Sequence, residues 1–256
     1  MPKLLDQYKL EGLQPGARDP GDPAVEELSR VIYEGPPERS AEAVAAALAE
    51  GISPEVVGEA ISLASNLMVL RQGAEKWRTH GDSAGVHSSD ATNAWRNMAR
   101  FAETRYALSG LIVAAYHVAV HTPFTTDPYP LAEHRAEIKA VDQEALLLEA
   151  EDAVRQNDQG RAAAAVAIYG EHGFSPDQVF DRMLKYTISE DGRLHGEKYF
   201  QTVREEFRTT RPAFRWRQLI GLGRVTASAY GYDRGDVHGR RAPGYEDACR
   251  LLKVDI

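Results

Sequence analysis

Residues 51–57, Gly-Ile-Ser-Pro-Glu-Val-Val, form a helix-start pattern that returns at residues 173–179 as Gly-Phe-Ser-Pro-Asp-Gln-Val. Each copy places a capping serine before a first-turn proline and an early acid, which is a common way for a helix to begin. Each copy also follows an alanine-rich segment, 41–50 or 161–171, and precedes a further helical segment, a glycine-containing loop and a histidine. A common helix start alone would explain the repeated residues, whereas the matching order of neighbours favours an internal duplication.

Apolar side chains recur with helical period through most of the remaining chain, and no window alternates apolar and polar residues as a strand would. Segment 108–120 is apolar on all sides, which predicts a central buried helix. Residues 1–23 contain four prolines and three glycines and are expected to form an extended arm. The sequence therefore predicts an all-α fold, with one duplicated helical domain over residues 24–256. Its similar halves, about 40–122 and 160–231, are expected to pack about a pseudo-twofold axis.

The composition excludes several classes of protein. A net charge of −8, from 30 basic and 38 acidic side chains, opposes binding to nucleic acid or to anionic lipid. No apolar run reaches the roughly 20 residues that a membrane-crossing helix needs. A single cysteine, Cys249, excludes an internal disulfide and a thiolate metal cluster. We expect a cytoplasmic protein, because the first residues also lack the apolar core of a signal peptide.

Two of the eight histidines, His117 and His121, lie four residues apart on the most apolar helical segment. Side chains at this spacing share one face of a helix, with Cβ atoms about 5–6 Å apart, so two imidazoles can bind one metal ion. The alternative is a pair of buried histidines that are hydrogen-bonded to polar neighbours.

His87 and His195 each follow a glycine-containing loop at the start of a helix, where the imidazole can point inward. Three residues further on lie Asp90, which can cap its helix or orient His87, and Lys198. Lys198 is either a solvated surface lysine or, once desolvated, a catalytic base. His238, in a glycine-rich segment near the C-terminus, is a fifth candidate ligand, although a flexible loop is the favoured explanation of this segment.

Imidazole ligands without thiolates suit iron, zinc, copper or nickel, and we favour Fe(II) with zinc or nickel as alternatives. The predicted site lies between the halves, where His87, His195 and His117 hold the ion, with His121 or His238 as a fourth ligand. The residues do not determine which carboxylate, if any, completes it, and the candidates are Glu59, Asp90, Glu103 and Glu151. Two other interpretations remain open, a zinc or nickel protein with hydrolytic or structural use of the metal, and a metal-free helical interaction scaffold.

Three stretches carry a resemblance to a known family. They are residues 191–200, Asp-Gly-Arg-Leu-His-Gly-Glu-Lys-Tyr-Phe, residues 81–87, Gly-Asp-Ser-Ala-Gly-Val-His, and residues 90–96, Asp-Ala-Thr-Asn-Ala-Trp-Arg. Together they resemble bacterial helical domains, some of them fused to Rieske ferredoxin modules, that are distantly similar to the questin oxidase-like family. The resemblance covers about residues 40–235.

The resemblance implies a non-haem iron oxidase or oxygenase that acts on an aromatic or polyketide-like small molecule. It also implies that Lys198 is the position to test as a carboxylated ligand, as in some members of that family. Because the chain has no Rieske cysteines, a separate ferredoxin-type protein is the expected electron donor. The helix starts also resemble AhpD-like helical peroxidases, but the Cys-x-x-Cys pair of those enzymes is missing here.

Overall fold

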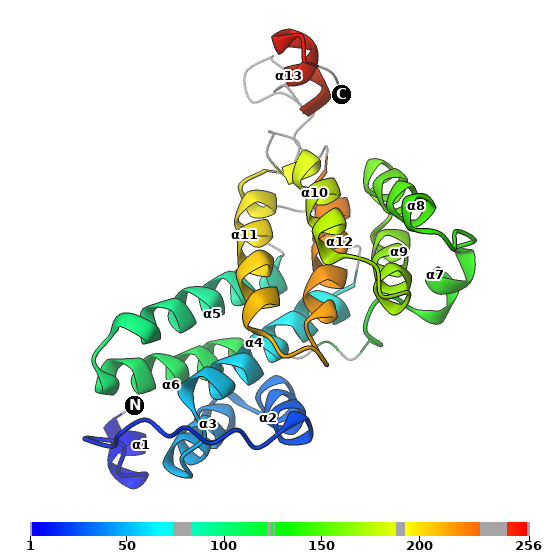
Figure 1. Ribbon diagram of the computed structural model, residues 1–256. Helices are drawn as coiled ribbons and strands as arrows, with labels where there is room; N and C mark the ends of the chain where they lie inside the picture. Colours follow the sequence, from blue (N-terminus) through cyan, green and yellow to red (C-terminus); the bar gives the residue numbers. More distant parts are fainter. Residues whose placement is uncertain are drawn as a thin grey trace. The chain divides into compact units, whose positions relative to one another are not determined.

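The computed structural model describes residues 2–73, 83–121, 124, 126–187, 193–230 and 245–254. Over this part of the chain the backbone forms helices and no strand, which confirms the predicted all-α class (Figure 1). The chain divides into two compact units. The first unit comprises Met1–Val69 and Ala84–Thr125, and the second comprises Leu70–Ser83 and Thr126–Ile256.

The first unit contains a short N-terminal helix followed by five longer ones. They are α1 (Pro2–Gln7), α2 (Asp22–Glu34), α3 (Pro37–Ala49), α4 (Pro54–Arg71, whose last two residues belong to the second unit), α5 (Ala84–Phe101) and α6 (Thr104–Val120). Helix α6 packs against α2, α3 and α5, and α2 also packs against α3. Their shared core includes Ile32, Val44, Ile61, Leu108 and Ile112, all of which are almost completely buried.

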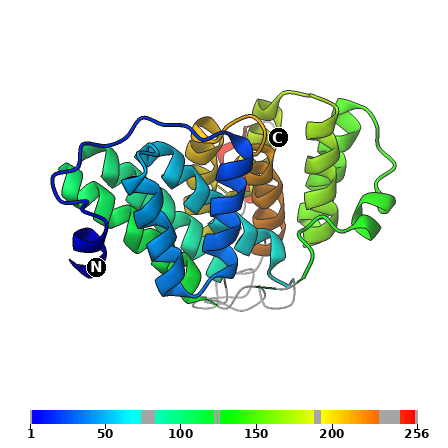
Figure 2. The same ribbon diagram turned by 90° about the horizontal axis from the view of Figure 1, so that it is seen from below.

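The second unit contains seven described helices. They are α7 (Ala132–Glu137), α8 (Gln143–Arg155), α9 (Gln159–Glu171), α10 (Pro176–Thr187), α11 (Arg193–Thr209), α12 (Trp216–Ala229) and α13 (Tyr245–Leu252). Helix α12 packs against α8, α9 and α11, and α8 lies beside α9 (Figure 2). The contact of α12 with α9 is close, because a Cβ on Gly223 would lie 3.0 Å from Val166. This explains the glycine within the helix.

Both predicted helix starts are confirmed. Helix α4 begins at Pro54, and the Ser53 hydroxyl accepts a hydrogen bond from the amide of Val56 at 3.2 Å. Helix α10 begins at Pro176, with the Ser175 hydroxyl 3.3 Å from the amide of Asp177. The preceding glycines, Gly51 and Gly173, have φ angles of 82° and 74°, a left-handed conformation that favours glycine at a helix end.

Two local predictions are wrong. Residues 1–23 are not simply an extended arm, because α1 forms within them and Leu5 and Leu10 are buried in the core of the first unit. Asp90 does not cap a helix, since α5 begins six residues earlier, at Ala84.

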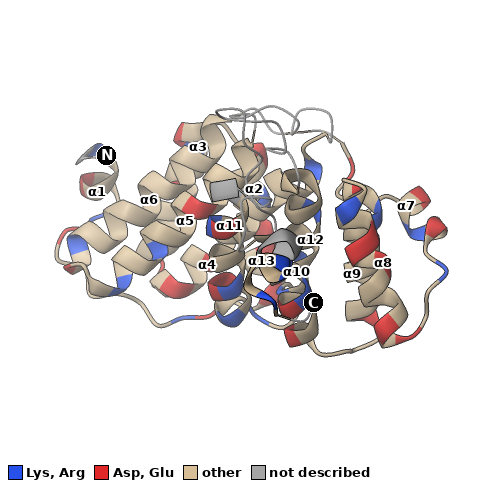
Figure 3. Ribbon diagram, turned by 90° about the horizontal axis from the view of Figure 1, so that it is seen from above, with Lys and Arg blue, Asp and Glu red and all other residues tan. Residues whose placement is uncertain are grey.

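The prediction that segment 108–120 is buried on all sides is also wrong. Helix α6 buries one face, whereas Val113, Tyr116 and Val120 are 39%, 42% and 54% exposed. Figure 3 shows α6 as tan over most of its length, since Arg105 is its only charged residue. None of the described helices is long and apolar enough to cross a membrane.

Candidate functional site

The two histidines of α6 lie close together in the first unit. His117 is in the last turn of the helix and His121 is its C-cap residue. Their ring centroids are 6.0 Å apart and the ring planes are nearly perpendicular, at 88°. The edge of Trp95, from α5, packs against His117 with ring centroids 5.2 Å apart. Both histidines are half-buried, so the pair is packed on one side and accessible on the other.

The surroundings of His117 favour its neutral form. Burial lowers the pKa of His117 below its usual value of 6.5, and the neighbouring His121 lowers it further. A neutral imidazole has a nitrogen lone pair available for a metal ion, whereas a protonated ring does not. At neutral pH, therefore, His117 is in the form that a metal ligand requires.

The other predicted residues of the first unit lie in different surroundings. His87 is in the first turn of α5, as expected, but its side chain is exposed and does not point inward. Asp90, one turn later, is half-buried. Lys198, on α11 of the second unit, is exposed, which agrees with the interpretation of a solvated surface lysine.

The remaining candidate ligands fall outside what the structure describes. His195 lies in α11, but its side chain is not among the described ones, and His238 lies in the undescribed segment 231–244. Among the described side chains, no three or more His, Cys, Asp or Glu residues are grouped closely enough to hold a metal ion. The predicted meeting of His87 with His195 joins residues of different units and stays a prediction.

The four candidate carboxylates have separate environments. Glu59 is buried within α4, and Glu103 is the exposed N-cap residue of α6. Glu151, in the second unit, is held by hydrogen bonds from Arg182, Lys185 and Tyr186. No carboxylate of the described residues therefore forms a ligand group with His117 and His121.

A pocket of about 520 Å³ lies between α1, α3 and α6 of the first unit. This volume is within the usual range for small-molecule sites. Its walls are mainly apolar, and Ile112, Val113 and Tyr116 line it from α6. Neither His117 nor His121 lines the pocket, so a molecule bound there would not be placed on the imidazole pair.

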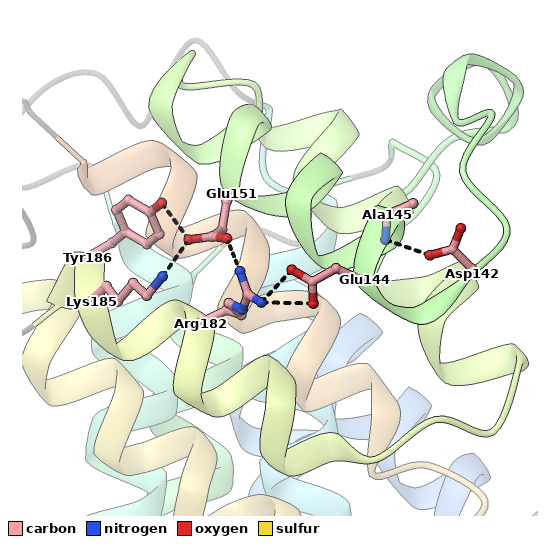
Figure 4. A network of polar contacts seen from close by, with 7 residues as sticks. All are labelled: Asp142, Glu144, Ala145, Glu151, Arg182, Lys185 and Tyr186. Carbon is pink, nitrogen blue, oxygen red and sulfur yellow. Dashed lines mark hydrogen bonds and ion pairs between the residues drawn. The ribbon is translucent and has the colours of Figure 1, made fainter. Parts of the chain in front are cut away.

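Sequence reasoning considered Glu151 only as a possible metal ligand and missed its role in an ion network of the second unit (Figure 4). Its carboxylate, 2% exposed, accepts from Arg182 at 2.5 Å, Tyr186 at 3.0 Å and Lys185 at 3.1 Å. Burial acts to raise the pKa of Glu151, but these three donors outweigh it and the pKa is lowered. Arg182 also bonds Glu144, so the network joins α8 to α10.

Arg224, a second residue that the sequence did not single out, is completely buried in α12. Its guanidinium lies 3.7 Å from the centre of the Tyr129 ring and donates to Gln159 at 3.2 Å and to the carbonyl of Gln72. Burial lowers the pKa of Arg224 to about 10. The only sign of this buried arginine in the sequence was a charged residue between Gly223 and Val225. The contacts of Arg224 hold segments that are distant in sequence together within the second unit.

Comparisons of the chain with known protein families, with curated proteins and with solved structures found no match.

Proposed function

We propose that the protein binds a divalent transition-metal ion, with His117 and His121 as two of the ligands. The observation that carries the proposal is the approach of the two rings to 6.0 Å between centroids at the end of α6. Metal–nitrogen bonds near 2 Å would place the centroids about 5 Å apart, so the rings need to close by on the order of 1 Å. Rotation of two half-buried side chains supplies a movement of this size.

The chemistry of the pair favours ions of intermediate softness. Imidazole suits zinc, nickel, copper and iron, whereas calcium and magnesium prefer oxygen ligands. The lowered pKa of His117 favours the unprotonated ring that a metal ion requires. Two protein ligands leave further positions open to water, to a substrate or to additional side chains.

Calorimetric titration of the metal-free protein with Zn²⁺ or Ni²⁺ tests whether His117 and His121 bind a metal ion. We expect one ion to bind per chain, and we expect His117→Ala and His121→Ala each to weaken that binding by at least about tenfold, since each change removes one of two ligands. His172→Ala is the matched control, because His172 is exposed at the end of α9 and stacks on Phe174. Equal binding by the wild type and the two α6 variants would contradict the proposal.

The wider proposal is that the ion is iron and that the protein oxidises an aromatic or polyketide-like molecule with oxygen. It is supported by the family resemblance described above and requires further ligands, for which His87, His195 and His238 are the candidates. Bound iron would supply oxygen activation, and a ferredoxin-type donor would supply electrons. Elemental analysis after anaerobic purification tests this proposal. One equivalent of zinc that is retained through dialysis would count against it and favour a hydrolytic or structural role.

We also propose that the two units arose by duplication. Support comes from the order and packing of their helices, since α2, α3, α5 and α6 contact one another in the same pairs as α8, α9, α11 and α12. The helix starts at Pro54 and Pro176 fall between corresponding helices of the two sets. The pseudo-twofold arrangement of the halves is part of this proposal. Solution scattering tests this arrangement, when the measured curve is compared with those calculated for symmetric and asymmetric arrangements of the two units.

A further inference from the structure

Helix α6 carries an exposed stripe of which only one residue, His117, belongs to the proposed metal site. The stripe consists of Tyr106, Gly110, Val113, His117 and Val120, and we call it the α6 stripe. Its residues are spaced four, three, four and three apart, the spacing of the contact positions in helices that pack along their length. Tyr106 is 65% exposed, and Val113 and Val120 are 39% and 54% exposed. The described residues of the first unit therefore leave much of this seam uncovered.

We propose that the α6 stripe binds the same stripe of a second copy of this chain, with the two α6 helices antiparallel about a twofold axis at Val113. The sequence of the stripe is self-complementary in this arrangement. Tyr106 faces Val120 of the other copy, Val113 faces itself, and Gly110 is offset by one residue from His117, the nearest residue of the opposite stripe. Where Tyr106 meets Val120, and where His117 lies beside Gly110, a larger side chain meets a smaller one, as close helix packing requires.

Gly110 is the residue that argues most directly for a partner. A glycine within a helix costs about 0.5–1 kcal/mol relative to alanine, so it calls for a packing reason. A Cβ on Gly85, Gly160 or Gly223 would lie 3.0 Å or less from a neighbouring atom. A Cβ on Gly110 would meet nothing within 4 Å. The described part of this chain does not require glycine there, whereas a second copy that places a histidine ring on the helix would.

The size and charge of the surface fit a second copy. Six large apolar side chains are exposed on α5 and α6, namely Met98, Phe101, Tyr106, Val113, Tyr116 and Val120. At about 150–250 Å² for a large aromatic side chain, the exposed fractions of all six amount to on the order of 600 Å², and Tyr106, Val113 and Val120 of the stripe supply less than half of it, against the 800 Å² that one partner contributes to a standard interface. Residues 106–120 contain no Asp, Glu, Lys or Arg, so α6 itself brings no charge to the seam, and the nearest charged side chains of the pocket beside Val113 are of both signs, Lys3, Glu38 and Glu42.

Cysteine cross-linking tests the axis and the direction of the helices, in a Cys249→Ser background so that only the introduced thiols react. In an antiparallel pair, Val113→Cys faces itself and forms a dimer when the protein is oxidised with diamide. Tyr106→Cys alone forms no disulfide-linked dimer, but it cross-links to Val120→Cys when the two proteins are mixed. Cross-linking of Tyr106→Cys to itself would indicate a parallel pair and overturn the arrangement. Leu148→Cys, an exposed apolar position on α8, is the control for random collision.

Sedimentation of the full chain measures the association itself. We expect a dimer whose dissociation constant rises at least about tenfold in Val113→Glu and in Tyr106→Glu, and is unchanged in Leu148→Glu. The experiment is run in EDTA, so that failure of the metal proposal does not affect it. A chain that stays monomeric up to about 100 μM overturns the proposal and would indicate that the stripe binds a different protein. A dimer that is unaffected by both stripe variants overturns it as well.

Discussion

Glu151 is a residue whose charge depends on the side chains that the fold brings around it. Its carboxylate is almost fully buried, yet it is satisfied by a guanidinium, an ammonium and a phenol. A hydrogen bond to a charged group contributes about 1.5–3 kcal/mol to stability. The cluster therefore stabilises the packing of α8 on α10.

We expect Glu151→Gln to lower the free energy of unfolding by about 1.5–3 kcal/mol, because Arg182 and Lys185 lose their hydrogen bonds to a buried carboxylate while Arg182 keeps its ion pair with Glu144. Glu144→Gln is the matched control. It removes a carboxylate that also bonds Arg182, but its side chain is 61% exposed, so we expect a loss below about 1 kcal/mol. Urea denaturation at neutral pH measures both. A similar loss for the two variants would show that burial of Glu151 does not decide the effect.

The difference in stability between the wild type and Glu151→Gln is also expected to depend on pH. The folded pKa of Glu151 lies below its usual value of 4.5, so the folded state holds the proton less tightly than the unfolded state. Its contribution to stability is therefore complete above about pH 4.5 and is lost as the pH falls through the folded pKa. We expect the difference in stability between wild type and Glu151→Gln to narrow on acidification. A difference that stays constant down to pH 3 would contradict the lowered pKa.

Gly110 of α6 and Gly223 of α12 lie in different surroundings. Gly223 faces Val166 across a close helix contact, whereas the Cβ position of Gly110 is open. In dilute protein, where the proposed dimer is dissociated, we expect Gly110→Ala to stabilise the fold by about 0.5–1 kcal/mol. Gly223→Ala should destabilise it by about 1–3 kcal/mol, because the added methyl overfills the contact. Chemical denaturation compares the two, and effects of the same sign would contradict this explanation.

The molecule combines a net negative charge with an exposed apolar surface. The net charge of −8 falls to zero near the isoelectric point of about 5.5, where repulsion between chains is weakest. We expect turbidity to be greatest near that pH and to decrease in Phe101→Ser, because Phe101 is 90% exposed. Leu148→Ser, which changes an exposed apolar residue of the second unit, is the comparison. Equal turbidity of the two variants would show that the α5–α6 surface has no special part in association.

Local sequence alone was sufficient for the fold class and for individual helix starts. Ser53-Pro54 and Ser175-Pro176 predict helix starts correctly because a cap and a first-turn proline act through neighbouring backbone groups. The spacing of His117 and His121 likewise predicts two nearby rings, since helical geometry needs no distant contact to place them.

Tertiary packing alone decided which faces are covered. The composition of α6 cannot reveal that one face packs on α2, α3 and α5 while Tyr106, Val113 and Val120 stay exposed. Nor can local sequence reveal that His87 is exposed, or that Arg182, Lys185 and Tyr186 converge on Glu151. Helical hydrogen bonds join residues four apart, so the chain specifies its helices locally. Burial depends on residues tens of positions away, and only the assembled helices determine it.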